Sequence, residues 1–538
     1  MRKLVLALLL AVVFVPATLY AGGIVTNTNQ SASFIRMPAL DAIIGVEGTY
    51  FNPAGLTNLS DGFYLSLSNQ TVSQTRNIKS TFDMNLQEFE GKVAAPLFPT
   101  FYAVYKKDKF AYSLGVNPIG GGGSAGFENG LPSFEQQVAV LPTLLTASGI
   151  PTTQYSVKSN FDGSSLNWGV QFNATYSLTE MLSFSIGFRY IYAKNTYTGY
   201  LKDMMINPNQ PAFGDEYNGS SLVSAPQFFT DASNTFSQWA FGANTYYVGL
   251  QGIVDAGLGT TLLINGATAG LTAEQIAQIQ GLLGAAGLPP AAIGAIDIQT
   301  AQATLGIAAP VFTQNSVIMA GYAANTSNKE VDAAQTGHGI APIIGVNMKF
   351  SDKFNLAVKY EHKADITLTN ETVIDGTGMF TDGAQTPSDM PSLLTVGVGV
   401  RPIEKLNINA GFHMYFDKNA NYGKQLNGEF VENSEVMDGN SIEAAFGLEY
   451  MVTDKILVSA GYLMTKTGAN DKYHSDLSHS LNTSSIGLGG KYMVNENIGI
   501  NLGFMKTMYQ GYTKSFTGYQ EEYNRDAMVI AVGIDYKF

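Results

Sequence analysis

The stretch MVTDKILVSAGY, residues 451–462, contains the pattern that organises the whole chain. One β-strand ends, a short polar turn follows, and a second strand begins in which Ile456, Val458, Ala460 and Tyr462 alternate with small or polar residues. Successive side chains of a strand point to opposite faces. This strand therefore has one apolar face and one small or polar face.

The same arrangement recurs at residues 177–188, 350–360, 401–412 and 493–504. The residues between the strands suit tight reversals of the chain. A soluble sandwich would bury the apolar faces against a second sheet, whereas a membrane barrel turns them toward lipid and keeps the polar faces inside.

Composition narrows the choice between these two architectures. Charged residues make up 14% of the 538 residues, and there are 57 glycines and no cysteine. Soluble proteins carry about 25% charge, so this chain resembles a large β-protein with two unlike faces. The lack of cysteine excludes disulfides, thiolate zinc sites and cysteine nucleophiles. The net charge of −13 argues against binding nucleic acid, which requires a basic surface.

Residues 1–21 predict a secretion signal peptide. Two basic residues at positions 2 and 3 precede an apolar run at 4–15, which is too short to span a membrane comfortably, and cleavage is expected after Ala21. No later run reaches about 18 apolar residues, so membrane-spanning helices are not expected.

Alternating segments separated by turns predict fourteen strands, an even number as in single-chain bacterial outer-membrane barrels. The predicted strands are 62–73, 97–106, 109–117, 164–177, 181–199, 338–350, 354–369, 390–401, 405–418, 440–452, 455–467, 481–494, 497–509 and 526–538. Short and long connections alternate strictly, which is typical of periplasmic turns and extracellular loops. We therefore predict an all-β fold, a 14-stranded antiparallel transmembrane β-barrel formed by residues 61–538 in the bacterial outer membrane.

The last predicted strand ends in Phe538 after an apolar alternation. A terminal aromatic residue of this kind resembles the signal that the barrel-insertion machinery reads, so that machinery is an expected partner. An edge strand as apolar as this one would promote aggregation in a soluble protein.

The large extracellular loop, residues 200–337, carries helix signals. Thr272 and Gln275 form a predicted capping box at the start of a helix over 271–284, and a second short helix is expected near 290–306. Four apolar residues share one face of the first helix: Ile276, Ile279, Leu282 and Leu283. Two interpretations stay open, namely that the helix packs over the barrel mouth, or that it forms part of a hydrophobic entry groove.

Residues 22–60, between the signal and the first strand, are rather apolar and lack strand alternation. A 14-stranded barrel has a lumen wide enough to conduct or to require filling. We predict that this segment folds into the lumen as an N-terminal plug.

Two short motifs carry a family resemblance. NPAGL, residues 52–56, resembles the hatch motif of the FadL family of outer-membrane transporters for hydrophobic compounds, and LGVNPIGGGGSAG, residues 114–126, resembles the family's third-strand region. The resemblance implies two sets of site residues. They are Asn52, Pro53, Ala54 and Gly55 for the plug, and Asn117, Pro118, Ile119 and Gly120 for a kink that acts as a lateral gate.

The implied mechanism is passive. External loops would collect a hydrophobic ligand, such as a long-chain fatty acid or a hydrocarbon, and pass it to a pocket beside the plug. Movement of the plug would then let it leave sideways through the wall into the membrane. Proline lacks an N–H and glycine tolerates unusual backbone angles, so residues 118–124 suit an interruption of strand pairing. The alternative, that they begin an ordinary loop, stays open.

Other function classes find less support. Arg36 in the predicted plug would contact a ligand carboxylate or pair with a luminal acid. The histidines at 474 and 479 match no metal-site spacing and no catalytic set is evident, so we expect no metal, no cofactor and no enzyme. A general diffusion porin with an open lumen, or an adhesin or receptor that uses loop 200–337, remain the alternatives. The expected partners are a hydrophobic small molecule and outer-membrane lipid, with the protein as a monomer.

Overall fold

The computed structural model describes residues 24–426 and 428–538, so the predicted signal peptide lies outside the described residues. The chain divides into two compact units. The barrel unit contains the described residues up to 136 together with 159–200 and 329–538. The helical unit contains residues 137–158 and 201–328. Each unit is described below by itself.

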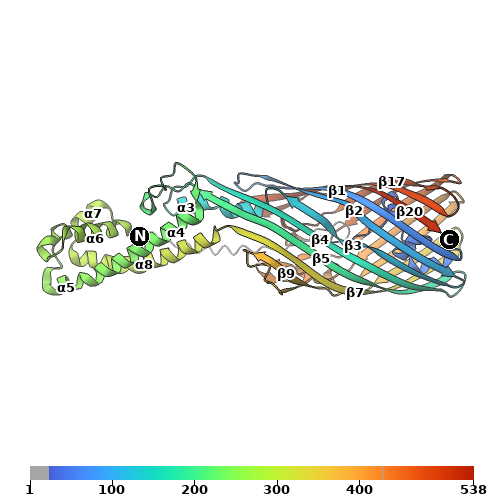
Figure 1. Cartoon of the computed structure of the whole chain (residues 1–538), viewed down its shortest axis with the longest axis horizontal. Helices are drawn as coiled ribbons and strands as arrows, with labels where there is room; N and C mark the ends of the chain where they lie inside the picture. Colours follow the sequence, from blue (N-terminus) through green and yellow to red (C-terminus); the bar gives the residue numbers. More distant parts are fainter. Residues whose placement is uncertain (1–23, 427) are drawn as a thin grey trace. The chain divides into compact units, whose positions relative to one another are not determined.

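The barrel unit is a closed antiparallel sheet of 14 strands, which confirms the predicted fold class. Its strands are β1 (Gly62–Ser80), β2 (Glu88–Lys107), β3 (Phe110–Phe127), β4 (Tyr155–Ser177), β5 (Leu182–Ile206), β7 (Lys329–Ser351), β8 (Phe354–Glu361) continued by β9 (Thr367–Asp375), β11 (Leu393–Ile403), β12 (Leu406–Tyr415), β15 (Ser441–Thr453), β16 (Ile456–Lys466), β17 (Thr483–Met493), β18 (Ile498–Tyr509) and β20 (Tyr519–Lys537). The sheet closes because β20 pairs with both β18 and β1, the red and blue strands of Figure 1. Two short strands, β10 (Gln385–Pro387) and β19 (Tyr512–Phe516), pair with β9 and β20. In the helical unit, β6 (Val223–Ser224) pairs with the end of β5 at Met205 and Ile206. A separate two-stranded pair consists of β13 (Gln425–Leu426) and β14 (Glu429–Phe430).

The strand alternation runs in the sense expected for a membrane barrel. On β16 the side chains of Val458 and Tyr462 are 45% and 44% exposed, whereas those of Ser459 and Thr465 are 8% and 3% exposed. The last strand repeats this arrangement, with Ile530 half exposed on the outside. An apolar exterior around a polar interior is the arrangement of an outer-membrane β-barrel.

Several strand boundaries differ from the prediction, and two of these differences have a clear physical reason. Strands β1 and β2 extend well into the predicted loop 74–96. The prediction missed these parts because inward-facing polar residues such as Gln74 and Arg76 resemble loop residues. The predicted strand 354–369 is interrupted after β8. Pro342 lies opposite the interruption and lacks the N–H that the ladder would require there.

The N-terminal segment, residues 24–60, is almost entirely buried in the barrel unit and contains α1 (Ala32–Arg36), η1 (Val46–Thr49) and η2 (Pro53–Asn58). Ser31 caps α1 by accepting a hydrogen bond from the Phe34 amide at 3.2 Å. Asn52 caps η2 in the same way, and Pro53 occupies the first helical position, where a missing N–H costs nothing.

Close packing of the N-terminal segment depends on glycines of the inner wall. A Cβ atom at Gly487 of β17 would lie 2.5 Å from the Ile35 carbonyl oxygen of α1. Only glycine leaves room for this approach, because a side chain would have to displace backbone atoms.

The helical unit contains α3 (Leu141–Ala147), α4 (Ala225–Gly249), α5 (Gln251–Ile253), α6 (Ala273–Ala285), α7 (Pro290–Ala295) and α8 (Ile298–Asn325), with η3 (Pro211–Phe213), η4 (Val254–Leu258) and η5 (Leu263–Ala269). The short helix α2 (Pro132–Ala139) joins residues of the two units. The capping box predicted for α6 is present at Thr272 and Gln275. The second helix is longer than predicted, since α8 has 28 residues. Helix α4 was not predicted, because its Thr, Asn, Gly and aromatic residues are weak helix formers and packing along α8 stabilises it.

Candidate functional site in the barrel lumen

The predicted plug motif at residues 52–55 is held by the inner wall. Within the motif, the Asn52 side chain accepts a hydrogen bond from the Gly55 amide at 3.1 Å. Three strands contact it: Asn347 of β7 accepts from Asn52 Nδ2 at 2.9 Å, Thr175 of β4 donates to the Pro53 carbonyl at 2.8 Å, and Ser183 of β5 donates to the Ala54 carbonyl at 2.6 Å. The motif therefore bonds to strands that are far apart in the sequence.

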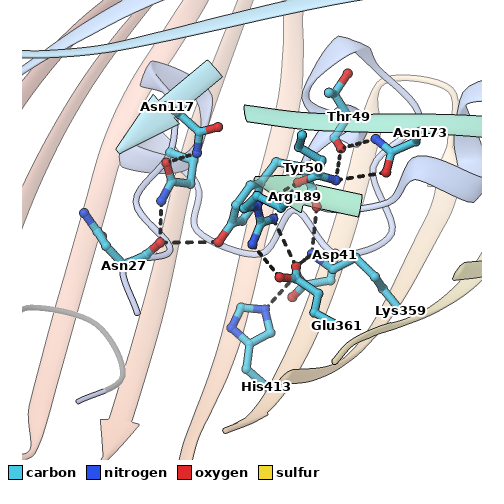
Figure 2. Close-up of polar contacts among 12 residues, drawn as sticks. Asn27, Asp41, Thr49, Tyr50, Asn117, Asn173, Arg189, Lys359, Glu361 and His413 are labelled. Carbon is cyan, nitrogen blue, oxygen red and sulfur yellow. Dashed lines mark hydrogen bonds and ion pairs between the residues drawn. The ribbon is translucent and has the colours of Figure 1, made fainter. Parts of the chain in front are cut away.

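A buried ion cluster surrounds Tyr50 of the N-terminal segment (Figure 2). Arg189 Nη1 lies 2.5 Å from Glu361 Oε2, and Lys359 Nζ lies 2.6 Å from Glu361 Oε1. Lys359 also donates to the Tyr50 carbonyl at 2.7 Å, and both cations lie 4.7 Å from the centre of the Tyr50 ring. Charges buried this deeply are tolerated only when they are paired. Loosening the segment at Tyr50 would remove two cation–π contacts from the cluster.

A second buried cluster links the N-terminal segment to β12 and β15, and Figure 2 shows two of its members, Asp41 and His413. His413 Nε2 lies 2.8 Å from Asp41 Oδ1, and His413 Nδ1 lies 2.8 Å from Glu443 Oε2. An imidazole donates from both nitrogens only when it is protonated, so this geometry is that of an imidazolium between two carboxylates. Tyr415 donates to the same Glu443 oxygen at 2.6 Å.

Arg36 is paired within the protein. Its Nη1 lies 2.7 Å from Glu449 Oε1 of β15, its Nε donates to Asn501 of β18 at 3.3 Å, and the residue is 5% exposed. Of the two roles considered for Arg36, the structure contains the ion pair with a luminal acid.

The pairing of β2 with β3 is interrupted along the middle of both strands. The ladder runs through Phe101 and Val116, stops, and resumes at Lys92 and Gly126. Residues 93–100 of β2 and 117–125 of β3 have no partners in this register, and we call this interruption the β2–β3 gap.

Three prolines lie in the gap, namely Pro96 and Pro99 on β2 and Pro118 on β3. Proline has no N–H, so an unpaired strand edge loses fewer donors there. On the other side of β3, the register with β4 shifts on both sides of Gly120, and Gly121 and Gly123 adopt φ angles of +84° and +73°. Those angles require glycine.

The start of the N-terminal segment binds the backbone of β3 at the gap. The Asn27 amide donates to the Ile119 carbonyl at 2.8 Å, and Thr26 forms an isolated antiparallel bridge with Gly120. A Cβ at Gly120 would collide with the Val25 carbonyl oxygen. Of the four predicted kink residues, Asn117 also contacts the segment, through the side chain of Gln30.

A cavity of about 70 Å³ lies beside the N-terminal segment. Its apolar lining comes from Phe34, Val72, Leu463, Met505 and Val529, and its polar lining includes Gln74, Thr507 and Tyr509. Glu443, a buried acid, also contributes to the lining. A mostly apolar chamber with a few polar groups suits a small hydrophobic ligand.

The residues predicted to form a groove in the long loop lie inside the helical unit. Ile279, Leu282 and Leu283 of α6 are buried in its core, and Ile276 packs against that core. Helices α4 and α8 contact α6, so these side chains act as core residues in this structure. A ligand groove at α6 stays a prediction.

The charged clusters were not predicted from the sequence. Lys359 and Glu361 are two residues apart on a strand whose other face is apolar, and this spacing places both on the inner face. Charge at an inward position was therefore a usable signal, although it does not reveal the partner strand. Across the described ranges 24–426 and 428–538, no group of three or more acidic or histidine residues has a geometry that could hold a metal.

Comparison with solved structures places this architecture in a known class. The toluene transporter TbuX of Ralstonia pickettii has a TM-score of 0.50 at 14% identity, over 95% of this chain and 99% of that one. A FadL homologue of Pseudomonas aeruginosa has a TM-score of 0.55 at 11% identity, over 96% and 100%. No family model and no curated protein matches the sequence. The chain is an outer-membrane-type β-barrel, and its fold is of the FadL type.

Proposed function

We propose that this protein moves hydrophobic small molecules, such as long-chain fatty acids or hydrocarbons, passively across the bacterial outer membrane. The ligand enters the barrel, binds beside the N-terminal segment and leaves through the β2–β3 gap. The observation that carries the proposal is the binding of residues 26–27 to Ile119 and Gly120 at the gap. One movement of the segment would then uncover both the chamber and the exit.

Lateral exit spares such a ligand the free-energy cost of entering water. Moving each CH₂ group into water costs about 0.8 kcal/mol, so an aqueous path penalises a long tail heavily. A gap facing lipid keeps the tail away from water. Its cost is unpaired backbone in hydrocarbon. The prolines and the bound N-terminal segment reduce that cost.

The alternatives have weaker support. A general diffusion porin requires an open lumen; against it, residues 24–60 are largely buried and form ion pairs with inward-facing side chains of the strands. The similar structures are described as a toluene transporter and a FadL homologue, which favours transport of hydrophobic compounds over an adhesin role.

A disulfide would test whether the segment must move. The ideal Cβ position at Gly345 of β7 lies 3.6 Å from the Ala54 Cβ, within the range of disulfide-bonded cysteines, and the Ser185 hydroxyl 2.5 Å away has to rotate to make room. The chain has no cysteine of its own, so the double variant Ala54→Cys/Gly345→Cys forms a single defined cross-link. We expect oxidised protein in liposomes to lose at least 90% of its uptake of a fluorescent fatty acid, and reduction to restore it.

The two single-cysteine variants are the matched controls, since each carries one substitution but no cross-link. They should transport as the unaltered protein does under both redox conditions. Full uptake by the oxidised, cross-linked double variant would contradict movement of the plug motif. Absence of uptake by the unaltered protein, with fatty acids and hydrocarbons alike, would contradict transport altogether.

A further inference from the structure

Helix α8 of the helical unit has one side in the core of the unit and the opposite side in solvent. The inner side contains Leu305 and Phe312, and Phe312 packs against Phe236 of α4. The outer side is exposed at seven positions, which we call the α8 stripe: Ala303, Ile307, Pro310, Gln314, Val317, Gly321 and Ala324. Its two largest aliphatic side chains, Ile307 and Val317, are 65% and 68% exposed.

The spacing within the α8 stripe is that of a helix-pairing surface. Successive members are alternately four and three residues apart, from residue 303 to residue 324. A repeat of this kind is the pattern by which two helices pack along their length in a coiled coil. Apart from Gln314 the stripe is apolar or small, and α8 contains no charged residue from Ile298 to Asn325. A charged partner would find no counter-charge here, so the stripe suits a helix that is equally uncharged.

Helix α4 provides a comparison within the same unit. Its outer side has the same alternating spacing, but most of the exposed positions are polar: Gln227, Thr230, Asn234, Ser237, Phe241, Asn244 and Val248. A polar outer side is usual for a helix that packs on a core and faces water. The outer side of α8 differs from that arrangement.

Gly321 has no packing role in its own unit. Glycine is among the least favourable residues in a helix interior. The other glycine of α8, Gly306, is explained by its neighbour, because a Cβ there would lie 2.8 Å from the Tyr247 ring. A Cβ at Gly321 would have no heavy atom within 4 Å. Gly321 therefore leaves space on the outside of the helix, where a side chain of another molecule can approach closely.

Two copies of the α8 stripe match in size when the helices run in opposite directions. A two-fold axis places each residue against the symmetry-related position of the stripe. The opposing pairs are Ile307 with Gly321, Pro310 with Val317, and Ala303 with Ala324. Gln314 is the middle member and meets its own copy, and two side-chain amides can each donate to the other. Parallel helices would instead place Ile307 against Ile307 and leave a void at Gly321.

The area of the α8 stripe indicates how strong this contact is. The stripe is about 33 Å long, and an apolar stripe about 100° wide on a helix about 10 Å across has an area of about 300 Å². Two copies would bury about 600 Å² together, whereas stable complexes bury about 1,200 Å² or more. The contact is therefore weak and reversible, and it depends on the concentration of the protein.

We propose that two copies of this protein associate through their α8 stripes, with the two α8 helices antiparallel. Such a protein is a reversible dimer rather than the monomer expected from its sequence. The contact involves residues of the helical unit alone, so the proposal is independent of the transport function above.

Cysteine cross-linking of the full-length protein in amphipol, where two copies can meet in any orientation, tests the association. The chain has no cysteine of its own. Gln314→Cys places two thiols beside the axis, and we expect at least ten times more covalent dimer than with Asn234→Cys. Asn234 is the matched control, because it lies on the polar side of α4 and its neighbour Ser233 bonds to Ser316 of α8.

The position of the thiol also reports the direction of the helices. Ile307→Cys should give no more dimer than the control, because antiparallel pairing separates the two thiols by about 21 Å along the helix. Disulfides require Cα atoms within about 7 Å. Efficient cross-linking of Ile307→Cys would overturn the antiparallel arrangement.

Adding Gly321→Leu to Gln314→Cys tests the size match and leaves the fold intact, since the space outside Gly321 is open. We expect the dimer yield to fall about tenfold, to the level of Asn234→Cys. Gly281→Leu is the matched control, at another helical glycine whose Cβ would have no heavy atom within 4 Å, and it should change the yield less than twofold. Equal dimer yields for Gln314→Cys and Asn234→Cys, or an undiminished yield with Gly321→Leu, would overturn the proposal.

Discussion

The two seams that flank β1 and β2 differ sharply. Strand β1 pairs with β20 without interruption from Tyr64 and Lys537 to Ser80 and Glu521. Strand β2, which follows β1 directly, loses its partner β3 over residues 93–100. The wall is therefore continuous where the first and last strands meet, and it is interrupted between two strands joined by a tight hairpin.

The difference shows that the interruption is built by local sequence. The first and last strands pair without interruption where they close the sheet, and the β1–β20 seam contains no proline in its register. The β2–β3 gap contains three prolines and lies beside two glycines with positive φ. An unpaired stretch in lipid is costly, so its retention here favours a role for it.

Proline substitutions in the two seams should differ most strongly in their effect on barrel assembly. Ile530 of β20 pairs with both β1 and β18, whereas Leu97 of β2 has no partner in the register with β1 or β3. We expect Ile530→Pro to prevent assembly, because it removes an N–H bond that lipid cannot replace, at a cost of several kcal/mol. Leu97→Pro should assemble normally. The folded fraction that resists SDS at room temperature measures both outcomes. Equal folded fractions for the two variants would show that the two seams do not differ in their need for backbone pairing.

Closing the gap should abolish transport without affecting assembly. Replacing residues 118–124 with a regular alternating strand would restore partners for β2. We expect fatty acid uptake in liposomes to fall at least tenfold while the folded fraction is unchanged. Ile119→Val, which keeps the proline and the glycines, is the control. Unchanged uptake after the replacement would argue that the ligand leaves by another route.

A single substitution should detach the N-terminal segment from the gap. A valine at Gly120 would collide with the Val25 carbonyl oxygen and break the bridge to Thr26. We expect hydrogen exchange in residues 24–30 to accelerate about tenfold, which corresponds to about 1.4 kcal/mol of local stability. Gly439→Val is the matched control, since a Cβ there has no heavy atom within 4 Å. Unaltered exchange in Gly120→Val would show that the bridge contributes little.

Acid should loosen the loop beside the continuous seam. His474 stacks on Tyr512 at 4.0 Å, and burial lowers its pKa to about 4 from its usual 6.5. The folded state therefore keeps this ring neutral, and its stabilising contribution is full above pH 6.5 and is lost as pH falls toward 4. Over that window we expect about 1 kcal/mol of lost protection per pH unit in residues 468–482. Hydrogen exchange measures it, and a His474→Phe variant with the same pH dependence would exclude His474 as the cause.

The barrel could be predicted from the sequence because lipid-facing positions are strongly patterned. Every predicted strand is present, since the apolar exterior imposes a period of two that short turns interrupt. The inner face carries no such regularity. Its polar residues on β1 and β2 therefore resembled loops, and both strands were predicted too short.

The buried clusters could not be derived in the same way. Arg189 and Glu361 are 172 positions apart, and their pairing depends on strand order, register and the path of the N-terminal segment together. The motif NPAGL indicated the segment, but not which strands would contact it. Helix α4 was not predicted because its stability comes from packing along α8, which local helix propensity does not encode.

The order of elements along the chain sets a condition on assembly. Residues 24–60 immediately precede β1, and β1 meets β20, the last strand, only when every other strand is already in place. We therefore expect the segment to take its place before the sheet closes, because afterwards its ion pairs and close glycine contacts would have to form inside the finished barrel. Because the N-terminal segment is synthesised before the strands, it is available when the strands assemble around it.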